Sequence, residues 1–159
     1  MRNIGFDGGS SLCVLGPVSD VILFFDCINV FAVEDHPQRD WSLLTDRLYR
    51  RYLRLEELDA AVALMNEVKK IFATVSTSAV AWENPTTKLN PNEPNLADVF
   101  ARYFDLFAHC VTSAKGFFED WNSYQPVRIV ISDLAEFVNE KERPLEEYDA
   151  LKGEPFWLH

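Results

Sequence analysis

The sequence has few cysteines, few histidines and no long uninterrupted apolar run. Its three cysteines, Cys13, Cys27 and Cys110, are an odd number without a C-x-x-C pair. Neither a disulfide framework nor a zinc site is predicted from them, and each is expected to be a buried, reduced thiol. The longest apolar stretch, 18–33, is interrupted by aspartate and asparagine and falls short of the roughly 20 residues that a bilayer requires. We therefore expect no metal, no cofactor and no membrane contact.

Positive charge is also scarce. The 159 residues carry 15 lysines and arginines against 25 acids, a formal net charge of -10. Attraction to nucleic acid or anionic lipid needs an excess of lysine and arginine, so direct nucleic-acid binding is not expected and a basic protein is the expected partner. With 48% apolar residues, the composition is that of a globular protein. We expect a single domain over 1–159, monomeric or weakly dimeric, whose last part is the acidic stretch 133–159.

The common catalytic signatures are missing as well. The chain has no Walker A loop, no G-x-G-x-x-G, no G-x-S-x-G and no H-E-x-x-H motif, so enzymatic activity is not expected. One alternative stays open, a small α/β enzyme or regulator whose site is assembled by folding from His109, Cys110 and the loop 83–95.

Residues 1–11 lack the positive and apolar regions of a secretory signal, and the chain is therefore expected to be cytoplasmic.

The apolar spacing that is present predicts both strands and helices. Helices are expected over 18–33, from Trp41 onward, over 58–72 with Leu58, Met65 and Phe72 in the core, and after Asn95, with a turn at 112–116 and a further helical piece over 117–121. Strands are expected at 12–15, near Val80, near Val111 and at 127–131. The predicted fold class is α/β (α+β), a single domain with three to four helices packed on a small mixed or antiparallel sheet.

Several segments together resemble the immunity protein 70 family. The matching features cover about two-thirds of the chain and are Asp20-Val21-Ile22, Trp41, Leu48-Tyr49, the helix through Leu64 and Val68, and Val80, Trp82 and Glu83. A Pro-Pro-Trp-Gly-like segment expected next is replaced by NPTTKLNPNEP, and the acidic C-terminal stretch is extra. The resemblance implies an inhibitor without enzymatic activity, which neutralises a toxin domain of a bacterial polymorphic toxin or contact-dependent growth inhibition system. Such toxin domains are often nucleases with basic clefts. An adaptor without a toxin partner is a third possibility.

If the partner is a basic toxin, exposed acids in polar loops are the expected contacts. The predicted toxin-binding residues are Glu34, Asp35 and Asp40 around Pro37, Glu83 and Glu93 in the proline-rich loop, and Trp41 as an anchor of the first cluster. A core position for Trp41 is the alternative interpretation. The distant acids of the C-terminal stretch, Glu140, Glu142, Glu146 and Glu147, are expected to contribute mainly to electrostatic steering.

Overall fold

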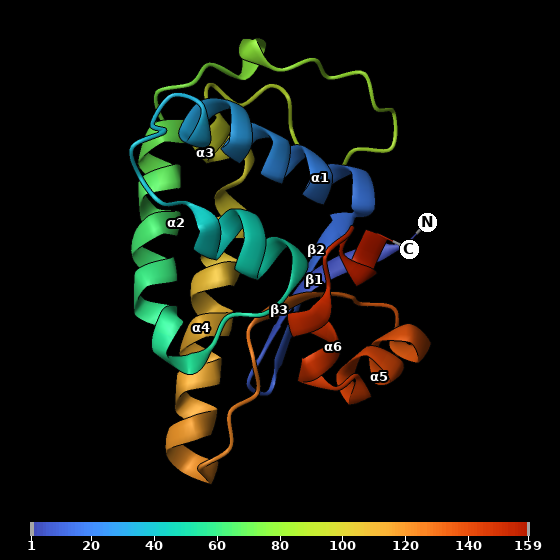
Figure 1. Ribbon diagram of the computed structural model, residues 1–159. Coiled ribbons are helices and arrows are strands. Elements are labelled where there is room, and N and C mark those ends of the chain that lie inside the picture. Colours follow the sequence, from blue (N-terminus) through green and yellow to red (C-terminus); the bar gives the residue numbers. More distant parts are fainter. Residues whose placement is uncertain (1, 159) are drawn as a thin grey trace.

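The computed structural model describes residues 2–158, apart from the side chain of Ala135. A sheet of three strands is covered by helices on both faces (Figure 1). The strands are β1, Asn3–Gly8, β2, Ser11–Pro17, and β3, Arg128–Ile131. The α-helices are α1, Val18–Cys27, α2, Leu58–Phe72, α3, Leu96–Val99, α4, Ala101–Trp121, α5, Leu134–Glu142, and α6, Leu145–Ala150. The π-helices are η1, Ile28–Val33, and η2, Leu43–Leu48, and the 3-10 helices are η3, Leu55–Glu57, η4, Thr77–Ala79, and η5, Phe156–Leu158.

The sheet is antiparallel throughout, in the order β2-β1-β3. The turn between β1 and β2 requires Gly9, whose φ of +59° lies in the left-handed region. A Cβ at Gly9 would also lie 2.4 Å from the carbonyl oxygen of Ser113 on α4. The hairpin is therefore pressed directly against the backbone of α4.

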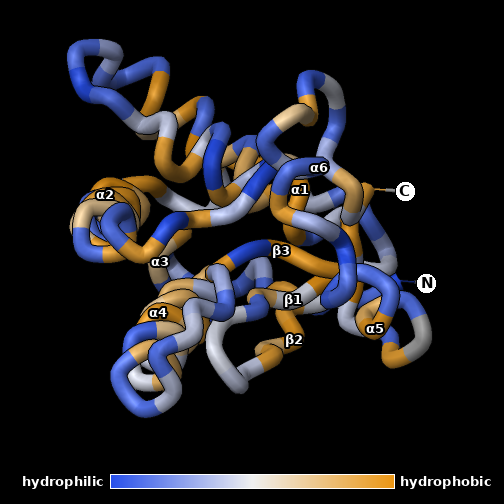
Figure 2. Tube along the Cα trace, turned by 60° about the horizontal axis from the view of Figure 1, so that its bottom comes forward, coloured by the Kyte–Doolittle hydropathy of each residue, from blue (hydrophilic) through white to orange (hydrophobic). Residues whose placement is uncertain are grey.

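One face of the sheet packs on a helical core. Ile4 and Phe6 of β1 are fully buried on this face, and the ring of Phe6 lies 5.6 Å from that of Phe107 on α4. Phe24 of α1 forms the centre of an aromatic cluster, with the rings of Phe72, Phe100, Tyr103 and Phe104 within 6.0 Å. Figure 2 shows hydrophobic positions alternating with hydrophilic ones along α2 and α4, as expected of amphipathic helices.

The other face of the sheet carries a buried charged network. Asp7 of β1 and Arg128 of β3 are directly paired across the strands and joined by an ion pair of 3.2 Å. Arg128 also donates to the hydroxyl of Tyr148 on α6 at 3.3 Å, and Tyr148 in turn donates to Glu140 on α5. Lys141 of α5 adds a second ion pair to Asp7, also at 3.2 Å. This network attaches the acidic C-terminal stretch to the sheet.

The predicted α+β class is confirmed, and of the two predicted arrangements of the sheet, mixed or antiparallel, the structure has the antiparallel one. The strands at 12–15 and 127–131 are present, and so are the helices over 18–33, which ends as η1, and over 58–72. Asn95 caps α3 as predicted, accepting a hydrogen bond of 2.9 Å from the backbone N–H of Asp98. Leu58, Met65 and Phe72 are buried as expected. The chain has more helices than the predicted three to four, because 133–159 contributes α5 and α6.

Three predictions of secondary structure are wrong. The turn at 112–116 does not exist, because Phe107, Cys110, Val111 and Ala114 continue one buried stripe and α4 runs through it to Trp121. That helix includes the piece at 117–121 and the expected strand near Val111. The segment near Val80 is extended but pairs with no described strand. The structure also has a strand that was not predicted, β1, because its glycines are typical of a loop.

A helix that spans a bilayer must be both long and apolar. No helix within residues 2–158 meets both requirements.

Candidate functional site

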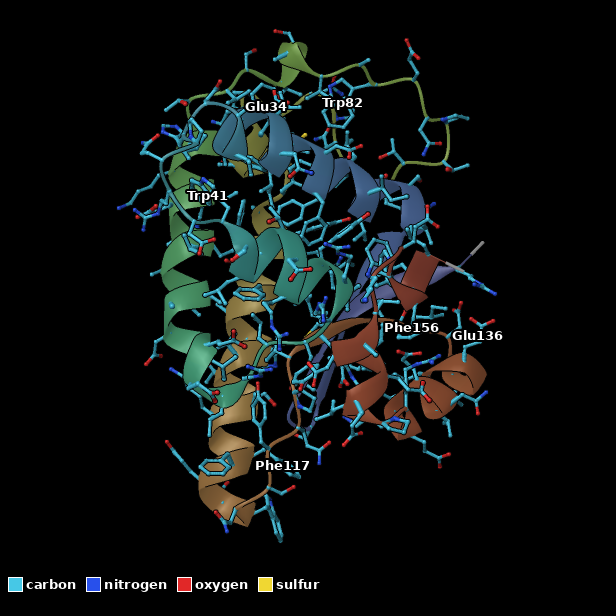
Figure 3. The ribbon with its side chains drawn as sticks, viewed as in Figure 1. Glu34, Trp41, Trp82, Phe117, Glu136 and Phe156 are labelled. Carbon is cyan, nitrogen blue, oxygen red and sulfur yellow. The ribbon has the colours of Figure 1, made fainter. Side chains whose placement is uncertain are left out.

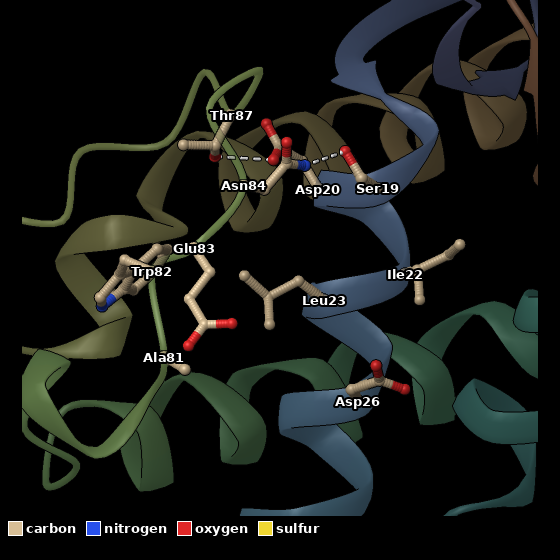
Figure 4. Close-up of a pocket in the computed structure, with 10 residues that line it drawn as sticks. All are labelled: Ser19, Asp20, Ile22, Leu23, Asp26, Ala81, Trp82, Glu83, Asn84 and Thr87. Carbon is tan, nitrogen blue, oxygen red and sulfur yellow. Dashed lines mark hydrogen bonds between the residues drawn. The ribbon is translucent and has the colours of Figure 1, made fainter.

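A groove runs between α1 and the segment 79–87. This segment follows α2 in the sequence and arches over α1 (Figure 1). Its larger part has a cavity volume of about 280 Å³ and its smaller part about 180 Å³, and the two parts share Leu23 and Asp26. Figure 4 shows the larger part, with Ala81, Trp82 and Glu83 on one wall and α1 on the other. We call the two parts together the α1 groove.

The wall opposite α1 is held by side chains, since it has no regular secondary structure. Asp20 on α1 is only 2% exposed and accepts hydrogen bonds from the Thr87 hydroxyl at 2.7 Å and the Lys88 backbone N–H at 2.8 Å. Asn84 donates to the hydroxyl of Ser19 at 2.6 Å, and the Trp82 indole donates to the Thr77 carbonyl at 2.9 Å. These hydrogen bonds fix both ends of the wall relative to α1 and η4.

The α1 groove combines an apolar surface with unneutralised acids. Its apolar lining includes Ile22, Leu23, Trp82 and, in the smaller part, Val30, Phe31 and Val80. Asp26 and Glu83 lie on opposite walls (Figure 4), and neither forms an ion pair with any described residue. Partial burial raises the pKa of Asp26. No lysine, arginine or histidine of the described chain lines the groove, so a cationic group would complete it.

The wall of the groove formed by α1 continues into a π-helix. Val30 lies on η1 and is 45% exposed at the smaller part of the groove. π-Helical segments are rare and are found frequently at functional sites.

Glu34 and Asp35, two of the predicted binding residues, lie immediately beyond η1. Both are exposed, and neither has an ion pair within the described chain. Figure 3 shows Glu34 and Trp82 at the same end of the molecule, and Phe117 at the opposite end. The structure therefore places Glu34 and Asp35 at the same end as the α1 groove, which Glu83 lines.

The other three predicted residues have different environments. Asp40 is exposed and accepts a hydrogen bond of 2.9 Å from the Ser42 backbone N–H. Hydrogen bonding to the Ser42 side chain, and secondly to this N–H, lowers the pKa of Asp40. Glu93 faces a separate pocket beside Lys88 and Arg102. Trp41 is only 3% exposed, and its indole donates to the His36 carbonyl at 3.0 Å. Trp41 thus lies in the core and supports the loop 34–40 from within. The core position, given above as the alternative to a binding anchor, is correct for Trp41.

Sequence reasoning missed the contribution of α1 to the groove. Leu23, Asp26 and Val30 are three to four residues apart, the spacing of one helical face. Asp26 interrupts the apolar run, which could have indicated that this face of the helix is not wholly buried. The partner wall carries no comparable signal, because its position depends on hydrogen bonds to α1 from residues far along the chain.

The alternative site of His109, Cys110 and the loop 83–95 is not assembled. His109 lies 3.3 Å from the Ser11 hydroxyl, and Cys110 lies against β1 and β2. The loop instead shares a pocket with Ala101, Arg102 and Tyr103 at the start of α4. At a helical rise of 1.5 Å per residue, this pocket is about 10 Å along α4 from His109.

Within residues 2–158, no group of three or more histidine, cysteine or acidic side chains is arranged to hold a metal ion. In comparisons with known proteins, no family model, no curated protein and no solved structure matches this chain.

Proposed function

We propose that this protein is an immunity protein that binds and neutralises a basic toxin domain of a polymorphic toxin or contact-dependent growth inhibition system. The toxin domain is a nuclease, and the inhibitor acts in the cytoplasm without catalytic activity of its own. The observation that carries the proposal is the α1 groove, an apolar depression with two unpaired acids and no cation among the described residues. The resemblance to the immunity protein 70 family points to the same class of partner.

The distribution of ion pairs across the molecule supports this surface. A basic stripe begins with Arg47 at the end of η2 and continues with Arg50 and Arg51 just after it. Each of these arginines forms an ion pair with an acid such as Asp46 or Asp149. The charge of this stripe is therefore largely neutralised, whereas Asp26 and Glu83 are left without a cation. A net charge of -10 then speeds encounter with a basic domain, and the unpaired acids orient it.

The α1 groove is the proposed centre of a larger contact. A stable interface buries about 800 Å² on each partner, so acids beyond the groove must also take part. Glu34 and Asp35 are exposed at the same end of the molecule and provide this rim. A lysine or arginine of the toxin would lie between Asp26 and Glu83, and an aliphatic or aromatic side chain beside it would cover Leu23 and Val30. Buried anchors of this kind contribute most of the binding energy in protein interfaces.

We expect a neighbouring reading frame to encode a large secreted protein with a C-terminal toxin domain, and we expect this chain to protect cells from that domain. The test is to express that domain in a susceptible bacterium, with and without this chain, and to count surviving cells. Co-expression should restore growth, and the two purified proteins should elute together from a sizing column. Continued killing, with no complex between the purified proteins, would contradict the proposed function.

A further inference from the structure

Cys13 and Cys110 are in contact although 97 positions separate them in the sequence. Cys13 is half-buried on β2, and Cys110 is fully buried on α4. Their Sγ atoms are 3.4 Å apart, and Cys110 Sγ lies at the same distance from the carbonyl oxygen of Phe6 on β1. The fold therefore brings together two thiols that sequence reasoning treated as separate buried residues.

The backbone around the two thiols fixes this contact. Cys13 is paired with Phe6 across the hairpin, so both side chains point to the face on which α4 packs. Phe107 contacts Phe6, and Cys110 follows on the same side of α4 after one helical turn. The helix is also very close to the strands, since a Cβ at Gly8 would lie 2.8 Å from the Cys110 carbonyl oxygen. Neither thiol can move far from the other without unpacking the hairpin.

We infer that Cys13 and Cys110 form a site of reversible oxidative modification, at which a small disulfide such as glutathione disulfide produces an intramolecular disulfide between β2 and α4. The bond must shorten the distance between the two Sγ atoms from 3.4 Å to about 2.05 Å. This change is within the reach of small side-chain rotations. The inference does not depend on the proposed function.

The reaction takes place in two exchange steps. The Cys13 thiolate, the more exposed of the two, attacks one sulfur of glutathione disulfide, forms a mixed disulfide and releases one glutathione thiolate. The Cys110 thiolate then attacks Cys13 Sγ, forms the internal bond and releases the second glutathione. The protons of the two protein thiols end on the two released glutathiones, so the protein is oxidised by two electrons and glutathione disulfide is reduced. Excess dithiol reverses the reaction.

The environments of the three cysteines give them different roles. Burial, together with the hydrogen bond to Cys13, raises the pKa of Cys110, so Cys110 is the slow, resolving thiol of the pair. Burial also raises the pKa of Cys27 to about 12, and no described thiol lies beside it. Cys27 therefore serves as an internal control, since it should stay reduced in the folded protein.

The disulfide would connect the hairpin to the longest helix. Because β2 leads directly into α1, the bond would also fix the start of the helix that forms the α1 groove. A disulfide that closes so long a loop constrains the unfolded chain strongly. We expect the melting temperature of the oxidised protein to rise by on the order of 10 °C.

The experiment is to incubate the full chain with glutathione disulfide and to analyse tryptic peptides by mass spectrometry without reduction. Cys13 and Cys27 fall in the peptide 3–39, and Cys110 falls in 103–115. The inference predicts a cross-link between these peptides, the loss of two of the three thiols and the rise in melting temperature. The cross-link should persist in Cys27→Ala and should be absent from Cys13→Ser and Cys110→Ser.

Three results would overturn the inference. One is a glutathione group that stays on Cys13 without forming the cross-link. Another is a cross-link that is lost in Cys27→Ala, and the third is a chain that keeps all three thiols while its melting curve shows that it is folded. Binding of the toxin domain by the reduced protein is measured separately, so failure of this inference leaves the proposed function standing.

Discussion

Lysine in place of Glu83 should weaken binding of the toxin domain by about 2–5 kcal/mol, at least about 30-fold in the dissociation constant. The same result is expected for Asp26→Lys, because both carboxylates line the α1 groove without an ion pair of their own. Each substitution turns an attraction to the partner's cation into a repulsion where water is excluded. The loss should lie mainly in the dissociation rate. Binding kinetics at low and high salt would measure it.

Two further variants separate contact from steering. Glu119→Lys changes the net charge by the same amount at an exposed position near the end of α4 and should change affinity only slightly. Asp35→Lys, on the proposed rim, should lower mainly the association rate, with an effect that fades at high salt. If Glu83→Lys and Asp26→Lys bind as tightly as Glu119→Lys, the α1 groove is not the contact.

Methionine in place of Arg128 should lower the free energy of unfolding by about 3–5 kcal/mol. Arg128 is 2% exposed and pairs with Asp7, which is 1% exposed. Removing the guanidinium leaves the Asp7 carboxylate buried with only Lys141 beside it, and Tyr148 loses its donor. Urea unfolding of the wild type and of Arg128→Met, followed by circular dichroism, would measure the change.

A double variant distinguishes an uncompensated charge from lost packing. Asp7→Leu combined with Arg128→Met removes both charges and should recover part of the stability that Arg128→Met loses. Arg2→Met, at the exposed ion pair with Glu136, is the control and should cost less than about 1 kcal/mol. If Arg128→Met costs no more than Arg2→Met, the network does not hold the C-terminal stretch on the sheet.

The amphipathic helices could be predicted from the sequence, because their positions depend on the local spacing of apolar residues. The helix 58–72 follows from Leu58, Met65 and Phe72, whose positions repeat with the helical period. The strand β1 could not be read in this way, because glycines interrupt it and Asp7 is buried inside it. Asp7 is buried only because Arg128, 121 positions later, lies beside it. Glu140 shows the same limit, since it was expected to be a solvent-exposed steering acid and is instead bound by Arg143 and Tyr148.

The sequence predicted which type of residue lines the candidate site, but not where in the fold the site lies. Sequence reasoning expected exposed acids in the loops, and Glu83 does line the α1 groove. It did not find Asp26, because a helix in an apolar run resembles a buried element. The pairing of the two walls depends on the hydrogen bond between Thr87 and Asp20, which are 67 positions apart. No local pattern reports such a contact.

Carboxylate footprinting of the complex tests the central claim most directly, because it measures which acids the partner covers. The chain alone and bound to the toxin domain would be labelled with a carbodiimide and an amine, and each carboxylate quantified by mass spectrometry. We expect labelling of Asp26 and Glu83 to fall severalfold in the complex, whereas Glu119 and Asp120 near the end of α4 keep their labelling. Unchanged labelling of Asp26 and Glu83, with protection of Glu119 and Asp120, would contradict this claim.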